Sequence, residues 1–187
     1  MNSSGIQSRL SHSQWSLKPQ DLAMAFKLVC LAGLKLPYAA LAAVMHMSAF
    51  EAHACLSRLT SARLLVVVND APAVVLPAFR PMVLSGAPYF FPAVRGGVTM
   101  GMPTSYGVEP LKSKLRLSGD LPPVWPQADG LDGLIRGTAL LPLYPKLPLA
   151  AAGDTPLYEL LALFDTLRSG QARERDLARQ FLEERLS

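Results

Sequence analysis

Residues 38–65, YAALAAVMHMSAFEAHACLSRLTSARLL, carry the pattern that decides the fold. Leu41, Val44 and Met45 recur at helical spacing behind Pro37, a residue type that suits the first turn of a helix. The alanines between them would let another helix approach closely. This part of the stretch therefore predicts a short helix that packs against a neighbouring helix.

The neighbouring helix is predicted to begin at Ser48, after the short turn His46-Met47. Ser48-Ala49-Phe50-Glu51 is a capping box, in which the serine oxygen accepts from the Glu51 N–H while the Glu51 carboxylate reaches back to the Ser48 N–H. An apolar stripe then recurs at helical spacing and is expected to be buried: Ala52, Cys55, Leu56, Leu59 and Ala62.

The flanking segments extend this pattern in both directions. A first helix is predicted over 19–32, because a proline and Asp21 suit its beginning and Gly33 would end it. Two apolar runs of strand-forming residues, 64–68 and 73–76, surround the polar turn Asn69-Asp70-Ala71-Pro72 and predict a hairpin.

The rest of the chain divides into a proline-rich part and a helical end. Thirteen of the sixteen prolines lie between Pro72 and Pro148, which predicts short elements: a helix over 77–85 closed by Gly86, then loops with short strands. Two amphipathic helices are predicted at the end, one capped by Thr155 and ending near residue 170, and one over 171–186.

These elements predict an α+β fold in three parts. Residues 1–16 form a flexible arm in which Trp15 is a candidate anchor, residues 17–77 form three helices with a hairpin, and residues 78–187 form a proline-rich region ending in the helix pair. The last region is assigned to effector binding or dimerisation. One interwoven domain and two small domains remain alternatives.

Composition bounds the class of protein. The chain has 187 residues, of which 50% are hydrophobic and 17% charged, which is enough for a buried core and excludes a disordered protein. A net charge of +4 permits contact with a polyanion. The last thirty-seven residues hold five basic and seven acidic side chains and are therefore an unfavourable place for phosphates.

Several chemistries lack their sequence signals. Cys30 and Cys55 fall on apolar helix faces and are expected to be free thiols, with a disulfide or redox pair as the alternatives. No metal-ligand spacing and no G-x-S-x-G, H-E-x-x-H or S-x-x-K motif occurs, so we expect no metal, no cofactor and no enzyme. Arg95-Gly96-Gly97 is interpreted as a turn, with a phosphate-binding loop as the alternative. The polar beginning of the chain and the short apolar segments predict a cytoplasmic protein that does not enter a membrane.

The stretch 38–65 resembles the helix-turn-helix core of bacterial winged-helix regulators related to MarR and Lrp. Ala42 matches the small residue where the two helices cross, residues 45–48 match the turn, and the apolar stripe matches the packed side of the recognition helix. His46 stands where these regulators usually have glycine. Motifs such as DLPPVWP and PLYPKLP make the whole chain similar to small winged-helix regulators of unassigned role.

The resemblance implies a sequence-specific regulator, a repressor acting on double-stranded DNA as a homodimer. Phe50 and Ala54 would contact thymine methyl groups, and His53 and Ser57 would donate or accept hydrogen bonds in the major groove. Cationic side chains would hold phosphates, and the hairpin tip would touch the backbone or minor groove. The complete candidate set is Lys35, Ser48, Ala49, Phe50, His53, Ala54, Ser57, Arg58, Arg63 and Asn69, with Lys18 as a further phosphate contact.

Each candidate has an alternative role. Glu51 is assigned to the helix cap over a cytosine contact, His53 is compatible with a solvated position, and Arg58 and Arg63 with surface charges. Phe50 could join a protein interface, and the helix has few polar residues that read bases. The second hypothesis is therefore a protein-interaction module, such as an antitoxin or a defence-system component. A third is ligand sensing by a pocket of aromatic residues: Tyr89, Phe90, Phe91 and Trp125.

Overall fold

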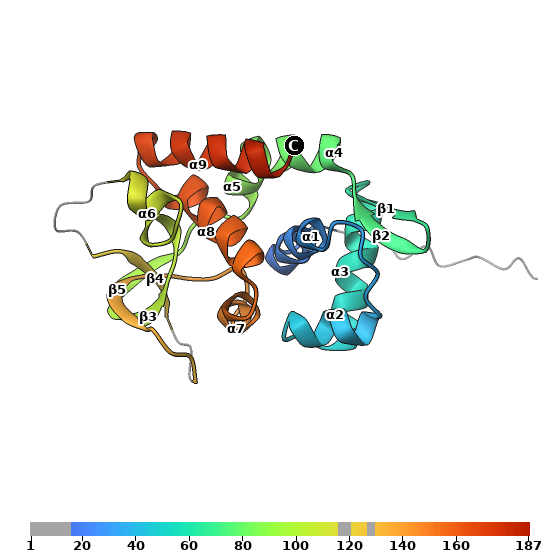
Figure 1. Cartoon of the computed structure of the whole chain (residues 1–187), viewed down its shortest axis with the longest axis horizontal. Coiled ribbons are helices and arrows are strands. Elements are labelled where there is room, and N and C mark those ends of the chain that lie inside the picture. The colour runs from blue at the N-terminus through green and yellow to red at the C-terminus, as the bar shows by residue number, and fades with distance from the viewer. Residues whose placement is uncertain (1–15, 116–120, 127–129) are drawn as a thin grey trace, which may run out of the picture.

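The computed structural model describes residues 16–115, 121–126 and 130–187. The arm predicted over 1–16 and its anchor Trp15 lie outside the described residues, apart from Ser16. The described chain has a mixed α+β fold (Figure 1).

Three helices and a hairpin form the amino-terminal unit. The helices are α1 (Pro19–Leu31), α2 (Tyr38–Val44) and α3 (Ala49–Ser61), and the hairpin pairs β1 (Leu65–Val68) with β2 (Ala71–Val74) in antiparallel register. All five elements occur in the predicted order, but β2 begins and ends two residues before the predicted run 73–76. In Figure 1 the hairpin extends from one end of the molecule beside α3.

The hairpin turn is shorter than predicted. Asn69 and Asp70 both have positive φ, 51° and 59°, which is the conformation of a two-residue turn that matches the twist of paired strands. Ala71 and Pro72 already belong to β2, where they pair with Val68 and Val67. The predicted four-residue turn is therefore wrong in length, because asparagine and aspartate alone supply the left-handed conformation.

A continuous helical segment follows the hairpin. It consists of α4 (Leu76–Pro81), the π-helix η1 (Met82–Gly86) and α5 (Ala87–Phe90), so the predicted closure at Gly86 is wrong. Pro88 explains the wider turn, because it has no N–H to donate and its ring clashes with the carbonyl four residues earlier in a regular α-helix. The π turn allows the helical segment to continue into α5 despite Pro88.

The proline-rich region contains a small sheet that the sequence indicated only as short strands. The long strand β3 (Arg95–Pro103) pairs antiparallel with both β4 (Pro123–Pro126) and β5 (Ile135–Leu140). Strands β4 and β5 also pair with each other in parallel, so the three strands close on themselves. The short helices η2 (Ser105–Gly107) and α6 (Leu111–Lys114) follow β3.

Three helices complete the chain: α7 (Leu147–Ala152), α8 (Thr155–Ser169) and α9 (Ala172–Arg185). The predicted terminal helix pair is confirmed as α8 and α9. The cap of α8 is Asp154, whose carboxylate accepts from the Leu157 N–H at 3.1 Å, and not Thr155 as predicted.

One hydrophobic core joins the amino-terminal unit to the rest of the chain. Phe26 on α1 contacts Phe79 on α4 and Phe164 on α8, with ring centroids 5.5 and 5.9 Å apart. Beyond this core, the buried carboxylate of Asp165 on α8 accepts from the Trp125 indole N–H at 2.7 Å and from the Thr104 hydroxyl at 2.6 Å. The small sheet is thereby tied to α8.

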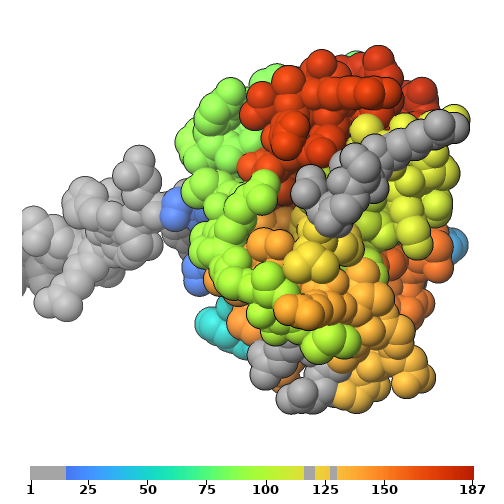
Figure 2. Space-filling model, turned by 90° about the vertical axis from the view of Figure 1, so that its left-hand side faces the viewer, coloured from blue at the N-terminus to red at the C-terminus, as the bar shows by residue number. Residues whose placement is uncertain are grey.

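The end of the molecule opposite the hairpin is built from segments far apart in sequence. Figure 2 shows parts of α9 (red), of the segment after the π-helix (green) and of β5 (orange) on this face. Among the described residues no single helix has the length and hydropathy needed to cross a bilayer, and α2 and α3 pass that test only together, although they are bent by 102°.

Candidate nucleic-acid interface

Helices α2 and α3 cross at a steep angle over a short turn. The angle is 102°, and the turn contains the four residues from Met45 to Ser48. The Met45 side chain is fully buried, and His46 adopts a positive φ of 49°. The His46 N–H donates to the Ala43 carbonyl at 3.0 Å, so the tight backbone is hydrogen-bonded within the turn.

The turn is also held by a residue from the other half of the chain. The Tyr144 hydroxyl donates to the Met45 carbonyl at 2.7 Å. Burial raises the pKa of Tyr144 above its ordinary value, so the phenol stays protonated and remains a donor. The orientation of α2 relative to α3 is thus coupled to the proline-rich region.

The cap of α3 is half of the predicted capping box. The Ser48 Oγ accepts from the Glu51 N–H at 3.1 Å, as predicted. The Glu51 carboxylate does not return to Ser48 and instead accepts from Arg58 at 2.6 Å and from Gln20 at 3.0 Å. The Arg58 contact is the main reason that the pKa of Glu51 lies below its ordinary value.

The inner face of α3 matches the prediction except at its end. Ala52, Cys55, Leu56 and Leu59 are buried. Ala62 is exposed, because α3 ends at Ser61 and the chain turns away at its C-cap. The predicted stripe is therefore one residue too long.

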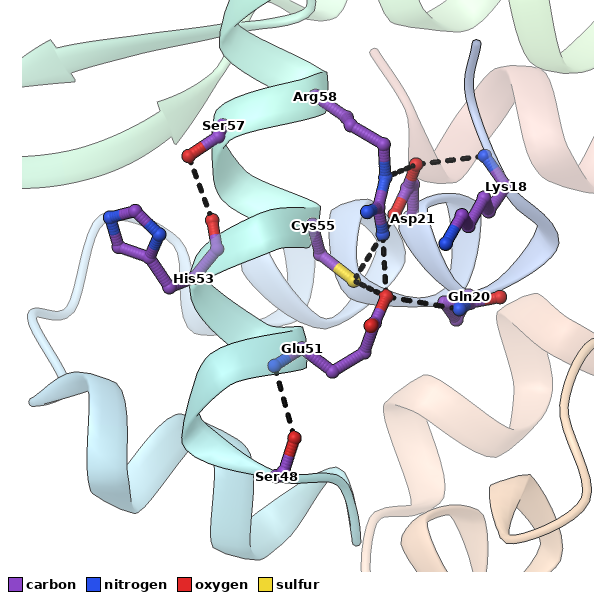
Figure 3. A network of polar contacts seen from close by, with 9 residues as sticks. All are labelled: Lys18, Gln20, Asp21, Ser48, Glu51, His53, Cys55, Ser57 and Arg58. Atoms are coloured by element: carbon purple, nitrogen blue, oxygen red, sulfur yellow. Dashed lines mark hydrogen bonds and ion pairs between the residues drawn. The ribbon is translucent and has the colours of Figure 1, made fainter. Parts of the chain in front are cut away.

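The Arg58 side chain is not available as a DNA contact, because it is bound to Asp21 inside the protein. Its Nε and Nη2 donate to the two carboxylate oxygens of Asp21, at 2.7 and 2.6 Å, and the Asp21 side chain is fully buried on α1 (Figure 3). The guanidinium is itself almost fully buried. A side chain that neutralises an internal carboxylate is not free to hold a phosphate.

The same cluster has the residue types of a metal site but not its chemistry. Ligand atoms of Asp21, Glu51 and Cys55 lie within 4.8 Å of one another. Arg58 Nη2 donates to all three, including the Cys55 sulfur at 3.5 Å, so a cation already occupies the space between them. Burial raises the pKa of Cys55 and keeps the thiol neutral, which disfavours it as a ligand.

The pKa of the second cysteine, Cys30, also lies above its ordinary value. Both Cys30 and Cys55 are free thiols, as predicted. Burial, together with the nearby charge of Asp154, raises the pKa of Cys30 to about 11. A neutral thiol is a weak nucleophile, so Cys30 is a packing residue.

The outer face of α3, defined here by Phe50, His53 and Ser57, is largely open to solvent among the residues that the structure describes. Phe50 is 81% exposed, His53 is exposed and Ser57 is half-buried. Figure 3 shows His53 and Ser57 on the side of α3 away from the Arg58 cluster. The Ser57 hydroxyl donates to the His53 carbonyl at 3.0 Å, so its oxygen is free to accept.

A groove of about 370 Å³ runs between the outer face of α3 and the hairpin. His53 and Ser57 line it from α3, and Asp70 and Pro72 from the hairpin. The Tyr38 ring also lines the groove and meets the His53 imidazole edge-on, with ring centroids 5.9 Å apart. The groove brings together two predicted contact residues and the hairpin tip.

The other predicted contacts do not line this groove. Ala49 and Ser48 are exposed at the beginning of α3, and Ala54 is half-buried. Three more polar candidates are exposed, in the segment before α2, just after α3 and in the hairpin turn: Lys35, Arg63 and Asn69. The candidate residues thus come from several segments of the amino-terminal unit.

The surface of the hairpin is more apolar than the sequence predicted. Strand β1 buries Leu65 but exposes Val66, Val67 and Val68, and Val67 is 71% exposed. The β-branched run was a signal for a strand, but it did not indicate that only one of its residues faces the core.

Comparison of the chain with protein-family models, with curated proteins and with solved structures finds no match.

Two other predicted features are corrected. Tyr89 and Phe90 project into solvent, whereas Trp125 is buried with its N–H bonded to Asp165, so these aromatic residues do not enclose a pocket. Arg95-Gly96-Gly97 begins β3 and is neither a turn nor a phosphate-binding loop. The Arg95 guanidinium donates to the Ser169 carbonyl.

Proposed function

We propose that this chain is a cytoplasmic DNA-binding transcription regulator in which residues 17–77 act as a winged helix-turn-helix. The observation that carries the proposal is the crossing of α2 and α3 at 102° with the outer face of α3 left uncovered. Helix-turn-helix motifs join two helices at about 90–120° through a turn of three or four residues. Strands β1 and β2 take the part of the wing, and no catalytic role is assigned.

In this proposal the amino-terminal half of α3 enters the major groove. Phe50 and Ala54 contact thymine methyl groups, and His53 supplies a hydrogen bond to a base edge. Lys35 and Arg63 hold phosphates on either side. The beginning of α3 at Ser48 and Ala49 lies against the backbone, and Asn69 reaches it from the hairpin tip.

The proposed regulator is a homodimeric repressor, because two copies double the phosphate and base contacts. The apolar stripes of α8 and α9 are not available for this purpose. Leu161, Phe164 and Leu182 belong to the chain's own core. Dimerisation would use another surface.

A salt titration tests DNA binding. A labelled duplex from upstream of the chain's own gene is titrated with the protein between about 50 and 200 mM salt, and the logarithm of affinity should fall linearly with the logarithm of salt concentration. Lys35→Gln and Arg63→Gln should each reduce the slope by about 1, because each removes a phosphate contact. Arg173→Gln on α9 is the control and should leave the slope unchanged. No binding, or binding independent of salt, would reject the proposal.

The exposed apolar residues favour a second candidate, a module that binds a protein partner such as a toxin. Phe50 and Val67 are mostly exposed, and an apolar surface beside a groove is typical of a protein interface. Pull-down from the native host discriminates between the two functions. A single stoichiometric partner without DNA, lost on Phe50→Asp, would favour the second candidate.

A further inference from the structure

A second pocket, of about 460 Å³, lies between the π-helix and the two terminal helices. Buried Leu84 of η1 and Leu167 of α8 form part of its lining, and Ser85 and Tyr89 line it at the surface. Its volume is within the range of sites that hold small molecules, about 300–1,000 Å³. The α3 groove and this pocket have no lining residue in common.

Three arginines line this pocket, and two of them are uncommitted. Arg168 is engaged, because it donates to Asp165 and to the Leu141 carbonyl, at 2.8 and 2.7 Å. Arg175 and Arg179 are one helical turn apart on α9, and neither guanidinium group forms a hydrogen bond or ion pair with any residue that the structure describes. Two guanidinium groups are therefore available to a ligand.

The local charge differs from the charge of the sequence segment. The last thirty-seven residues are acidic in total, but α9 contributes Arg175, Arg179 and a single acidic residue, Asp176, to the pocket. The Arg168–Asp165 pair is neutral, which leaves one net positive charge in the lining. The other acidic side chains of the last thirty-seven residues do not line the pocket.

We propose that this pocket binds a small molecule carrying a phosphate or carboxylate group. Arg175 and Arg179 would bind the oxyanion, since guanidinium groups form paired, charge-assisted hydrogen bonds with both groups. The Ser85 hydroxyl supplies a further donor, and Tyr89 offers an aromatic surface to the rest of the molecule. The π-helix that presents Ser85 is a type of element often found at functional sites.

Isothermal titration of the full chain tests this site, with inorganic phosphate and succinate as probes at constant ionic strength. At least one probe should bind at a single site, with an affinity about tenfold or more weaker in the Arg175→Gln/Arg179→Gln variant. Asp176→Asn should strengthen binding severalfold, because it removes the repulsive charge. Arg173→Gln, on the same helix but outside the pocket lining, should bind like the unmodified chain.

The two probes identify the group that is recognised. Binding of phosphate, of succinate or of both, weakened by the double substitution, supports the proposal. Absence of binding of either probe up to about 10 mM, which corresponds to less than about 3 kcal/mol, would overturn it. Equal binding by the double variant would also overturn it, because the anion would then occupy another site.

Discussion

Arg58 and Asp21 join α3 to α1 through a bidentate salt bridge, with Arg58 Nε 2.7 Å from one carboxylate oxygen of Asp21 and Nη2 2.6 Å from the other. Asp21 also accepts from the Lys18 N–H at 2.8 Å and thereby fixes the beginning of α1. A fully buried carboxylate with these partners specifies how α3 lies on α1. It therefore also determines which face of α3 points outward.

Arg58→Met should destabilise the fold strongly. Loss of the guanidinium leaves the buried Asp21 charge without its partner, which costs about 3–5 kcal/mol of unfolding free energy in comparable cases. Urea denaturation measures the change. The control is Arg63→Met, an exposed position just after α3, where we expect a change within about 0.5 kcal/mol. A loss below about 1 kcal/mol for Arg58→Met would show that the pair does not hold the helices together.

Two glycines in the small sheet should not tolerate alanine. A Cβ at Gly101 would overlap the Trp125 carbonyl, and one at Gly137 would overlap the Pro122 carbonyl. These are close approaches between backbones in a sheet of three mutually paired strands. Gly101→Ala and Gly137→Ala should each cost more than about 1–3 kcal/mol, the usual range for overpacking, because backbone rather than side chains must move.

Gly97→Ala is the matched control for this pair. Gly97 lies on the same strand as Gly101, but a Cβ there would have no neighbour within 4 Å. Alanine should therefore be neutral or stabilise by about 0.4–1 kcal/mol, through the lower entropy of the unfolded chain. Thermal unfolding of the three variants checks the ranking. Equal effects at positions 97 and 101 would contradict the close strand packing.

The sequence predicted those parts of the fold that depend on local signals. Ser48 caps α3 and the apolar stripe faces inward because both features involve residues a few positions apart. The role of Arg58 was not predictable in this way, since its partner Asp21 is 37 residues away and both residue types are usually exposed. The closed sheet was also missed, because glycines and prolines in β3 and β4 argue locally against strands.

Asp165 should be sensitive to the loss of its charge. Its buried carboxylate accepts from Thr104, Trp125 and Arg168. Asp165→Ala should cost about 3–5 kcal/mol, because Arg168 and the indole N–H lose their acceptor in a buried place. Asp165→Asn keeps one acceptor oxygen and should cost less.

Trp125→Phe separates the hydrogen bond from the charge at this site. It removes the indole donor and part of the packing but leaves the Arg168–Asp165 ion pair intact. We expect a loss between those of the control Ser113→Ala, at an exposed position of α6, and Asp165→Ala. Chemical denaturation measures all four variants. If Asp165→Ala were as mild as Ser113→Ala, the carboxylate would not tie the sheet to α8.

His46→Gly should stabilise the protein although it removes a side chain. His46 has φ of 49°, a left-handed conformation that costs a non-glycine residue about 1–2 kcal/mol. Glycine avoids this cost but increases the entropy of the unfolded chain, so a net gain of about 0.5 kcal/mol is expected. The control is Ala43→Gly at an exposed position of α2, which should lose about 0.5–1 kcal/mol because its conformation is helical. Opposite signs for the two glycine substitutions in thermal unfolding would confirm that the turn is strained. Equal losses would mean that the imidazole stabilises the turn by more than its backbone conformation costs.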